Sequence, residues 1–311
     1  MYLSHFLLKE SPFNITPDTA FFMNRAGHQD ALNVLLVALR SGEGFIKVTG
    51  EVGVGKTILC RMLLKVLKKE AATAYLHNPY LEPDTLLLAI ADSLSAKVDK
   101  SDSQYSILRA LTRRLIEIHR EGRKVVLCLD EVQAMPIKTL ETLRLLTNLE
   151  TEKRKLIQVV MFGQPELDKV LENPSIRQLK QRITFSYRLQ PLNEVALLSY
   201  VKHRLSVAGS TRNDLFSKQA IDCLKHFSGG IPRLINILCH KAMLLAYGEG
   251  DSQIRLKHMH MAARDTLETQ ESSLSRFRLW IPSFGRWAFA SGCLVAAAGG
   301  YQAVQLLEAM R

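Results

Sequence analysis

The sequence predicts an α/β fold in which a parallel sheet is covered by helices on both faces and followed by a smaller all-helical unit. Short apolar runs alternate with amphipathic helical patterns, as in such sheets. The runs are 45–49, 73–77, 125–129, 156–162 and 184–189, and the helical patterns are 57–69, 83–96, 104–121 and 136–149. The third run is apolar throughout, which is typical of a parallel strand buried on both faces. From Pro191 onward only helical patterns remain.

The first predicted element is a helix from His28 to Leu39, which ends a lead-in with few charges. Its apolar side chains recur at the three- and four-residue spacing of a helix face. They are Ala31, Leu32, Leu35, Leu36 and Leu39.

The first strand runs into a complete phosphate-binding loop, G-x-x-x-x-G-K-[ST], with an amphipathic helix after it, and this strand–loop–helix context is the one that the motif needs. The loop is Gly50, Glu51, Val52, Gly53, Val54, Gly55, Lys56 and Thr57, and Ile58 follows. Backbone N–H groups at a helix N-terminus attract a polyphosphate. We expect Lys56 to reach the β- and γ-phosphates of ATP and Thr57 to hold Mg²⁺. We expect the N-terminal segment that ends in the helix His28 to Leu39 to pack beside the nucleotide base. A glycine-rich turn with a solvated lysine is the alternative.

The third strand delivers two acids at its carboxyl end, where ligands of open α/β sheets bind. These are Asp130 and Glu131, directly after the apolar residues 125–129. We expect Asp130 to lie on Mg²⁺ or next to it, and Glu131 to polarise the attacking water. An acidic pair that merely begins a loop is the alternative.

Helix signals divide the region after Pro191 into a compact helical unit. Asn193 and Ser217 are typical N-caps, and Pro232 suits the first turn of a helix. The predicted helices end near Gly209, Gly229 and Gly248, and a last amphipathic helix covers about 256–267. This unit resembles a lid over a nucleotide.

Composition narrows the class of protein. The chain has 311 residues, 47% of them hydrophobic, and 41 Lys and Arg against 30 Asp and Glu, a net charge of +11 that suggests an anionic partner such as ATP, nucleic acid or a membrane surface. Five cysteines without a C-x-x-C pair predict reduced, packed thiols and neither disulfide nor zinc. We interpret His258 and His260 as a solvated helix face. The N-terminus lacks signal-peptide features, so we expect the bulk of the chain to stay inside the cell.

Near the C-terminus a basic segment, 271–286, precedes 21 residues without a formal charge, 287–307. As a helix these would extend about 31 Å and just span a bilayer core. Gly292, Ala296 and Gly300 have the spacing that lets membrane helices approach closely. The arginines before the segment predict an inner-membrane anchor with the rest of the chain in the cytoplasm. A buried amphipathic helix is the alternative.

Several motifs across residues 1–270 resemble those of the ExeA/GspA group of secretion-pathway AAA+ ATPases, and of the related ATPases of mannose-sensitive haemagglutinin (MSHA) pilus biogenesis. Besides the phosphate loop they are Ser11-Pro12-Phe13, Thr16-Pro17-Asp18, 28–32, 130–133, 143–151, Gly163-Gln164-Pro165-Glu166-Leu167 and 177–183. ExeA/GspA proteins carry a periplasmic cell-wall-binding domain after their membrane helix. Here only Glu308 to Arg311 follow the apolar segment, so we do not expect this chain to bind peptidoglycan. This shorter arrangement resembles the ATPases of MSHA pilus biogenesis more than the ExeA/GspA proteins.

The resemblance implies roles for four further residues. Gln164 matches a polar sensor of the γ-phosphate or attacking water, and Arg233 matches a lid arginine that reaches back to the phosphates. Arg182 or Arg177, just before the fifth strand, matches the arginine finger that enters a neighbouring subunit's site, which implies a homo-oligomer. The sequence cannot orient the turn that connects them, and Arg182 is favoured. An ordinary strand-end amide and exposed surface arginines are the alternatives.

Together these features predict four segments: an AAA+ α/β domain over 1–190, a helical lid over 191–270, a basic linker over 271–286 and a membrane helix over 287–307. The expected function is ATP hydrolysis that supports assembly of a type IV pilus or type II secretion apparatus. Two alternatives remain: a DNA-binding AAA+ regulator resembling the transposition ATPases TnsC and TniB, and a nucleotide-binding scaffold that hydrolyses slowly or not at all.

Overall fold

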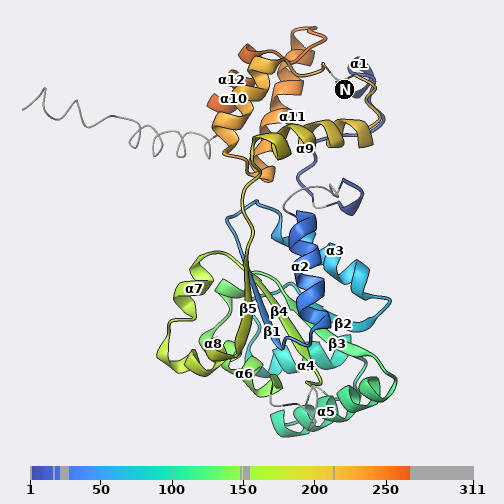
Figure 1. The fold of residues 1–311 in the computed structure, drawn as a ribbon, viewed down its shortest axis with the longest axis vertical. Coiled ribbons are helices and arrows are strands. Elements are labelled where there is room, and N and C mark those ends of the chain that lie inside the picture. Colours follow the sequence, from blue (N-terminus) through green and yellow to red (C-terminus); the bar gives the residue numbers. More distant parts are fainter. Residues whose placement is uncertain are drawn as a thin grey trace, which may run out of the picture.

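A computed structural model describes residues 2–16, 18–21, 28–99, 101–147, 149, 155–212 and 214–266, and Figure 1 shows that they form a sheet-containing part and a helical unit. The sheet has five parallel strands in the order β2-β3-β4-β1-β5. Their bounds are β1 Phe45–Thr49, β2 Ala71–Leu76, β3 Lys124–Leu129, β4 Gln158–Gly163 and β5 Ile183–Arg188. The predicted parallel α/β fold is confirmed, and each strand lies within two residues of its predicted position.

Helices cover both faces of this sheet. On one face lie α2 (His28–Arg40) and α3 (Lys56–Leu67). The other face is covered by α4 (Pro83–Ser93), α5 (Gln104–Arg120), α6 (Ile137–Thr147), α7 (Glu166–Val170) and α8 (Arg177–Arg182). Short 3-10 turns η1 (Thr19–Phe21), η2 (Val132–Ala134) and η3 (Pro174–Ile176) complete the connections.

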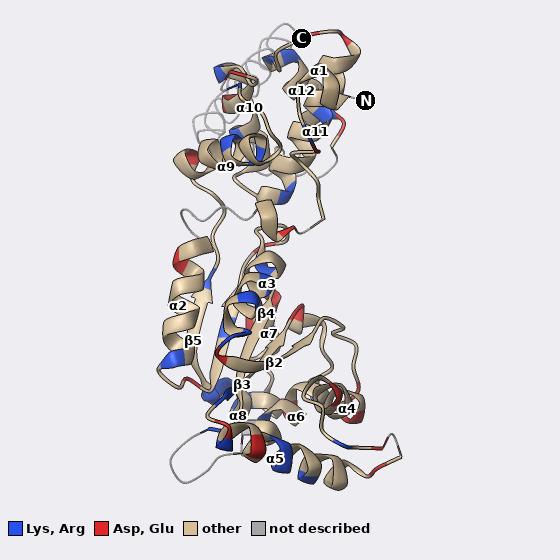
Figure 2. Cartoon of the chain, turned by 90° about the vertical axis from the view of Figure 1, so that its right-hand side faces the viewer, with Lys and Arg blue, Asp and Glu red and all other residues tan. Residues whose placement is uncertain are grey.

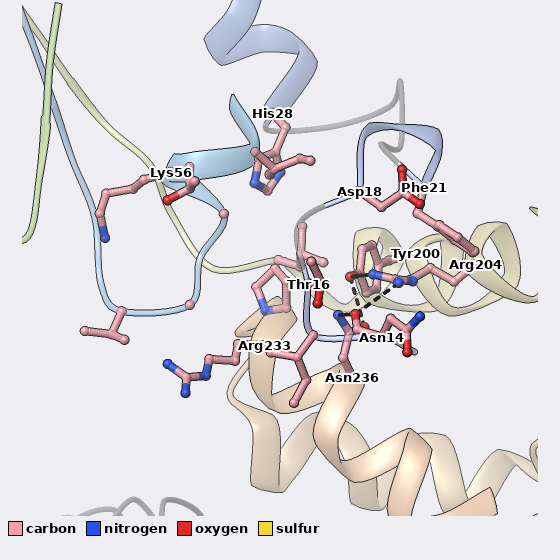
Figure 3. Close-up of a pocket in the computed structure, with 18 of the residues that line it drawn as sticks. Asn14, Thr16, Asp18, Phe21, His28, Lys56, Tyr200, Arg204, Arg233 and Asn236 are labelled. Atoms are coloured by element: carbon pink, nitrogen blue, oxygen red, sulfur yellow. Dashed lines mark hydrogen bonds between the residues drawn. The ribbon is translucent and has the colours of Figure 1, made fainter. Parts of the chain in front are cut away.

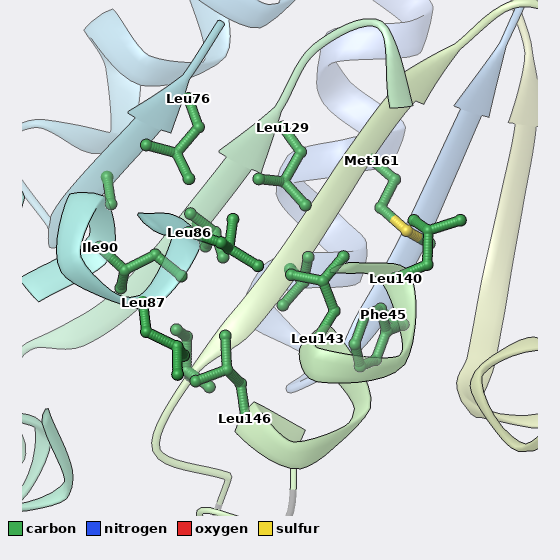
Figure 4. Close-up of a cluster of buried hydrophobic side chains, with 14 of the residues drawn as sticks. Phe45, Leu76, Leu86, Leu87, Ile90, Leu129, Leu140, Leu143, Leu146 and Met161 are labelled. Carbon is green, nitrogen blue, oxygen red and sulfur yellow. The ribbon is translucent and has the colours of Figure 1, made fainter. Parts of the chain in front are cut away.

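The alternation of side chains along β3 shows how the two faces share one sheet. Val125, Leu127 and Leu129 contribute to the cluster under α4, α5 and α6, part of which Figure 4 shows. Val126 and Cys128 point the opposite way, into the cluster under α2 and α3. Because successive side chains of a strand face opposite sides, an uninterrupted apolar run fills both cores.

The helical unit consists of α9 (Glu194–Val207), α10 (Lys218–Ser228), α11 (Pro232–Gly248) and α12 (Leu256–Arg264). Its predicted start signals are confirmed: Asn193 and Ser217 accept hydrogen bonds from the N–H groups of Ala196 and Ala220, and Pro232 begins α11. Figure 1 shows this unit beyond the edge of the sheet at which the strands end.

The start of the chain packs against the helical unit. Tyr2 in α1 (Tyr2–His5), together with Phe6, Phe13 and Phe21, lies in the same buried cluster as α9 to α12. These residues therefore contribute to a core made mostly by residues beyond 191, although they precede the sheet in sequence.

One connection differs from the sequence prediction, and two predicted segments lie outside the described residues. The connection between β4 and β5 holds the short helices α7 and α8, for which the sequence predicts no helix, because five or six residues are too few to show a helical period. The predicted linker 271–286 and membrane helix 287–307 lie outside the described residues. Within those residues, no helix combines the length and apolarity that a membrane span requires.

Candidate functional site

The strand order brings the three predicted catalytic segments together. β1 is next to β4, and β4 is next to β3, so the phosphate loop, Gln164 and the Asp130–Glu131 pair all follow the carboxyl ends of adjacent strands. Connections at that edge of a parallel sheet form the ligand site of open α/β folds. The geometry thus places sequence segments more than 100 residues apart at one site.

Lys56 begins α3 and is almost completely buried, with 5% of its surface exposed. Its Nζ donates to the carbonyl oxygens of Gly50 (2.9 Å) and Glu51 (3.0 Å), within the phosphate loop. Burial lowers the pKa of Lys56, and the carboxylates of Glu131 and Asp130 oppose that effect. A buried ammonium bonded to neutral carbonyls is well prepared to move to a triphosphate, which offers it negative charge.

Thr57 and Asp130 form the pair expected to hold Mg²⁺. The Thr57 hydroxyl donates to Oδ2 of Asp130 over 2.9 Å, and Asp130 is 1% exposed. The Tyr75 hydroxyl contacts the same oxygen at 3.4 Å, and burial, aided by the Asp130 charge, raises the pKa of Tyr75 so that it remains a donor. A carboxylate and a hydroxyl at a helix N-terminus are oxygen donors of the kind that Mg²⁺ prefers. These two residues therefore fit the ion.

Glu131 and Gln164 lie within hydrogen-bond distance of each other. Gln164 Nε2 donates to Oε2 of Glu131 over 3.2 Å, and the same oxygen accepts from Gln133 Nε2 over 2.6 Å. Both Glu131 and Gln164 line the cavity that also borders the phosphate loop. The predicted water-activating acid and the predicted sensor are thus in contact.

The cavity has a volume of about 310 Å³ and lies between the phosphate loop and the helical unit (Figure 3). The loop contributes Val52, Gly53, Gly55, Lys56, Thr57 and Ile58, and the helical unit contributes Leu192, Tyr200, Arg204, Pro232, Arg233 and Asn236. The N-terminal segment closes a further side with Asn14, Ile15, Thr16, Asp18 and Phe21. Phosphate-binding groups and a partly apolar chamber are therefore contiguous.

Arg204 joins the N-terminal segment to the helical unit beside this chamber. Its guanidinium donates to the carbonyl oxygens of Pro12 and Asn14 (2.5 and 3.3 Å) and to the Tyr200 hydroxyl (2.9 Å). It also lies 4.6 Å from the ring centre of Phe21. With 6% exposure, Arg204 is a buried link that sequence reasoning missed, because nothing in a helical pattern marks an arginine as buried.

The predicted arginines fall into two groups. Arg233, in the first turn of α11, has an exposed side chain and lines the cavity. Arg177 and Arg182 are the ends of α8, before β5, and neither lines the cavity. Figure 1 shows α8 at the end of the sheet away from the helical unit. His28, whose Nε2 lies 2.8 Å from the Val54 carbonyl oxygen, also lines the cavity and had no predicted role.

The interpretation of His258 and His260 as a solvated face is wrong for His258, which is fully buried. Its Nδ1 accepts from the Arg255 N–H, and its Nε2 lies 3.1 Å from Glu249 and 3.2 Å from Asp251. These two acids come from the loop before α12, outside the helical pattern that contains His258. Together with His258 they have the spacing of metal ligands, but the Lys257 ammonium contacts both carboxylates. The group is therefore an internal ion-pair network that fixes the start of α12.

The α/β part of the chain matches a known protein family. Residues 39–171 match the family model described as AAA domain. This range contains the phosphate loop, the Asp130–Glu131 pair and Gln164, and the α/β part has the P-loop NTPase fold.

Most of the chain is also similar to a secretion protein. Over 299 residues, 96% of the chain, it is 39% identical to general secretion pathway protein A of Aeromonas hydrophila, and it spans about half, 52%, of that relative's length. Among solved structures, Pyrobaculum aerophilum Cdc6p matches with a TM-score of 0.62 and 20% identity over 80% of this chain and 71% of that one. The Aeropyrum pernix ORC2 protein, solved as ADPNP–ADP complexes, gives 0.57 and 17% over 80% and 72%. The two structures support the fold alone.

Proposed function

We propose that the protein hydrolyses ATP to support assembly of an envelope machine, because residues 39–171 match an AAA domain model and nearly the whole chain is similar to about half of general secretion pathway protein A. The machine proposed is a type IV pilus of the MSHA kind, served by an MshM-like protein, or a type II secretion apparatus. The observation that carries the proposal is the convergence of the phosphate loop, Glu131, Gln164 and Arg233 on one cavity.

The residues divide the chemistry among themselves. The loop amides and Lys56 bind the phosphates, and the Thr57–Asp130 pair would hold Mg²⁺, which neutralises phosphate charge when bound. Glu131 accepts the proton of the attacking water, and Gln164 holds that water or the γ-phosphate in line. The nucleoside would lie at the side of the cavity that is lined by Asn14, Thr16, Phe21, Tyr200 and Asn236, which offers both polar and apolar contacts.

The helical unit converts nucleotide state into movement in this proposal. Arg233 presents an exposed guanidinium to the cavity from the first turn of α11, where a cation opposes the local helix dipole. A γ-phosphate between Lys56 and Arg233 would draw the helical unit towards the sheet, and its loss would release it. We further propose that an arginine of α8 completes the site of a neighbouring copy, which makes the active form a homo-oligomer.

The direct test is nucleotide binding and hydrolysis by the purified protein. Wild type should bind ATP in a magnesium-dependent way and release phosphate. Glu131→Gln should bind ATP yet hydrolyse it at least about 100-fold more slowly, the usual contribution of a general base. Lys56→Ala should lose binding, and Glu172→Gln, an exposed acid outside the cavity, should behave as wild type. Absence of magnesium-dependent ATP binding in wild type would refute the proposal, and binding without hydrolysis would favour the scaffold alternative.

The envelope role and the inner-membrane location need a test in cells. A Glu131→Gln copy should abolish pilus display or secretion of exoproteins while the variant remains present at normal level. A tagged wild-type chain should sediment with inner membranes, and deletion of 287–307 should release it to the soluble fraction. Normal pili and normal secretion in the variant would separate ATP hydrolysis from envelope assembly.

The DNA-binding alternative has one structural observation in its favour. Arg109, Arg113 and Arg120 are exposed along one face of α5, without a carboxylate partner among the described residues, and Figure 2 shows this basic helix at the end of the molecule away from the helical unit. A helix face with three free cations can contact a phosphate backbone, with an affinity that falls steeply with salt. Retention on duplex DNA at about 150 mM salt that is lost in a triple Gln variant would favour this alternative.

A further inference from the structure

Gln133, two residues after Glu131, uses both ends of its side-chain amide within the site. It lies in η2, directly after β3 and the acidic pair. Its Nε2 donates to Oε2 of Glu131 over 2.6 Å, and its Oε1 accepts from the backbone N–H of Gln164 over 2.9 Å. One side chain therefore bridges the carboxyl ends of β3 and β4.

The conformation of Glu131 makes this bridge significant. Its φ is 55°, in the left-handed region that residues other than glycine seldom adopt. Such conformations persist where the surroundings hold them, and they concentrate at functional sites. Both hydrogen bonds to the Glu131 side chain end on Oε2, from Gln133 and Gln164. Oε1 has no hydrogen-bond partner in the part of the chain that the structure describes. One carboxylate oxygen of Glu131 is therefore fixed by two amides, and the other is free to accept a hydrogen bond from water.

The structure also keeps room for the Gln133 amide. A Cβ atom on Gly163, the last residue of β4, would lie 3.1 Å from Gln133 Oε1 and 2.8 Å from Leu167 Cδ2. Any larger residue at 163 would thus press on the amide oxygen that binds Gln164. The absence of a side chain at this position allows the bridge to form.

We propose that Gln133 is a positioning residue for ATP hydrolysis: it holds Oε2 of Glu131 and the backbone of Gln164 in a fixed relation, so that Oε1 of Glu131 faces the attacking water. It acts through Glu131 and does not line the nucleotide cavity itself. The proposal rests on the ATPase function proposed above, since positioning a general base matters only if water is activated there. A displacement of about 1 Å at such a group can cost roughly 100-fold in rate.

The test compares Gln133→Met, which keeps the length of the side chain but removes both hydrogen bonds, with Gln104→Met, the same change at an exposed position at the start of α5. For Gln133→Met we expect kcat to fall about 10- to 100-fold while the affinity for MgATP stays within about twofold, because the cavity wall is unchanged. Gln104→Met should match wild type. Thermal unfolding of each variant shows whether the fold is intact.

A double-mutant cycle distinguishes positioning from a general structural role. In a Glu131→Gln background, under single-turnover conditions, adding Gln133→Met should lower the rate no further, because the group through which Gln133 acts is already gone. Gln133→Glu keeps an oxygen to accept from Gln164 but replaces the donor by a second carboxylate, so it should lose rate as well. This variant serves as the test if Gln133→Met proves unstable.

The outcomes separate this inference from the proposed function. If wild type hydrolyses no ATP, the proposed function itself fails. If wild type is active and Gln133→Met is equally active or faster, Gln133 does not position Glu131. Losses of kcat and of MgATP affinity in equal proportion, or a further loss in the Glu131→Gln background, would likewise overturn the inference and leave the ATPase function in place.

Discussion

The backbone N–H of Arg233 donates a hydrogen bond to the carbonyl oxygen of Gly53 over 3.2 Å. This bond joins the first turn of α11 in the helical unit directly to the phosphate loop. The approach is close because Gly53 has no side chain: a Cβ atom there would lie 2.6 Å from Cβ of Arg233 and 3.1 Å from Cγ2 of Ile231. This contact provides a direct physical route between phosphate binding at the loop and movement of the helical unit.

Replacing Gly53 by alanine should break this contact. Gly53 has φ of 79° and Gly122 has φ of 78°, but nothing lies within 4 Å of a Cβ at Gly122. Gly122→Ala should therefore lower the free energy of unfolding only by the cost of placing alanine in the left-handed region, roughly 1–2 kcal/mol. Gly53→Ala should show that strain plus displacement of the helical unit, with affinity for MgATP reduced about tenfold or more. Calorimetric titration and thermal unfolding measure both. Equal effects of the two changes would show that the Gly53–Arg233 contact is unimportant.

Magnesium dependence should distinguish two hydroxyl groups that bond the same oxygen, Oδ2 of Asp130. Thr57 donates to it at 2.9 Å and is expected to ligate the ion, whereas Tyr75 donates at 3.4 Å and has no expected metal contact. Thr57→Ala should raise the Mg²⁺ concentration needed for half-maximal ATP binding about 10- to 100-fold, the usual effect of losing such a group at a metal site. Tyr75→Phe should change it little. Fluorescent-ATP binding during a Mg²⁺ titration measures this, and a reversed order would remove Thr57 from the metal site.

The sequence predicted the parts of the site that are contiguous in the chain. The loop 50–57 and the Asp130–Glu131 pair each carry their chemistry and their strand context within a few residues, so both could be located and their roles assigned. Gln133 could not, since its function depends on a contact with Gln164 across the β3–β4 boundary. Arg204 and His28 were missed for the same reason: each acts on a segment distant in sequence, and neither residue type reveals its burial.

Short helices and buried polar clusters also could not be predicted from the sequence. α8 has six residues, fewer than two helical turns, so the segment between β4 and β5 shows no helical period and no helix is predicted there. His258 was expected to be solvated because its acidic partners, Glu249 and Asp251, come from the preceding loop. Apolar periodicity predicts layers of helices and strands well, but it carries no information about which polar groups meet.

Acidification should weaken the contact between α2 and the phosphate loop. Burial lowers the pKa of His28, while its bond to the Val54 carbonyl partly opposes that effect. Below pH 6.5 the unfolded chain takes up a proton that the folded chain resists, so stability falls as pH falls through this range. Between pH 7.5 and 5.5 wild type should therefore lose more thermal stability than His28→Gln. His260→Gln, at an exposed position, controls for the substitution. Burial also lowers the pKa of His240, which contributes equally in wild type and variant. The contribution of His28 is therefore the difference between the two proteins in the thermal stability lost on acidification.

Arg204 should be a major source of stability for the N-terminal segment. Arg204→Met leaves the carbonyl oxygen of buried Pro12 without its donor, which costs about 1–3 kcal/mol, whereas the exposed Asn14 keeps a hydrogen bond from Asn236. Lys225→Met removes only an exposed ion pair with Glu194 and should cost less than about 1 kcal/mol. Urea unfolding gives both values, and hydrogen exchange should show residues 2–21 opening first in Arg204→Met. Equal destabilisation by the two variants would contradict this role.

The arginines of α8 should act between subunits. Arg177 is exposed and Arg182 is half-buried, and neither lines the chain's own cavity. If Arg182 is the finger, Arg182→Ala should lower the ATPase rate about 1000-fold or more and leave MgATP binding intact, whereas Arg177→Ala should have a much smaller effect.

Mixing inactive variants tests whether that arginine works on a neighbour. Glu131→Gln subunits lack the base but keep Arg182, and Arg182→Ala subunits have the opposite defect. In a mixed assembly, a site with an intact Glu131 can face an intact Arg182 of the adjoining copy, so activity should return to a substantial fraction of the wild-type rate. The same mixture with Arg177→Ala in place of Arg182→Ala identifies the residue if the first pair fails. No recovery in either mixture, with assembly verified by light scattering, would show that both arginines act within their own chain or not at all.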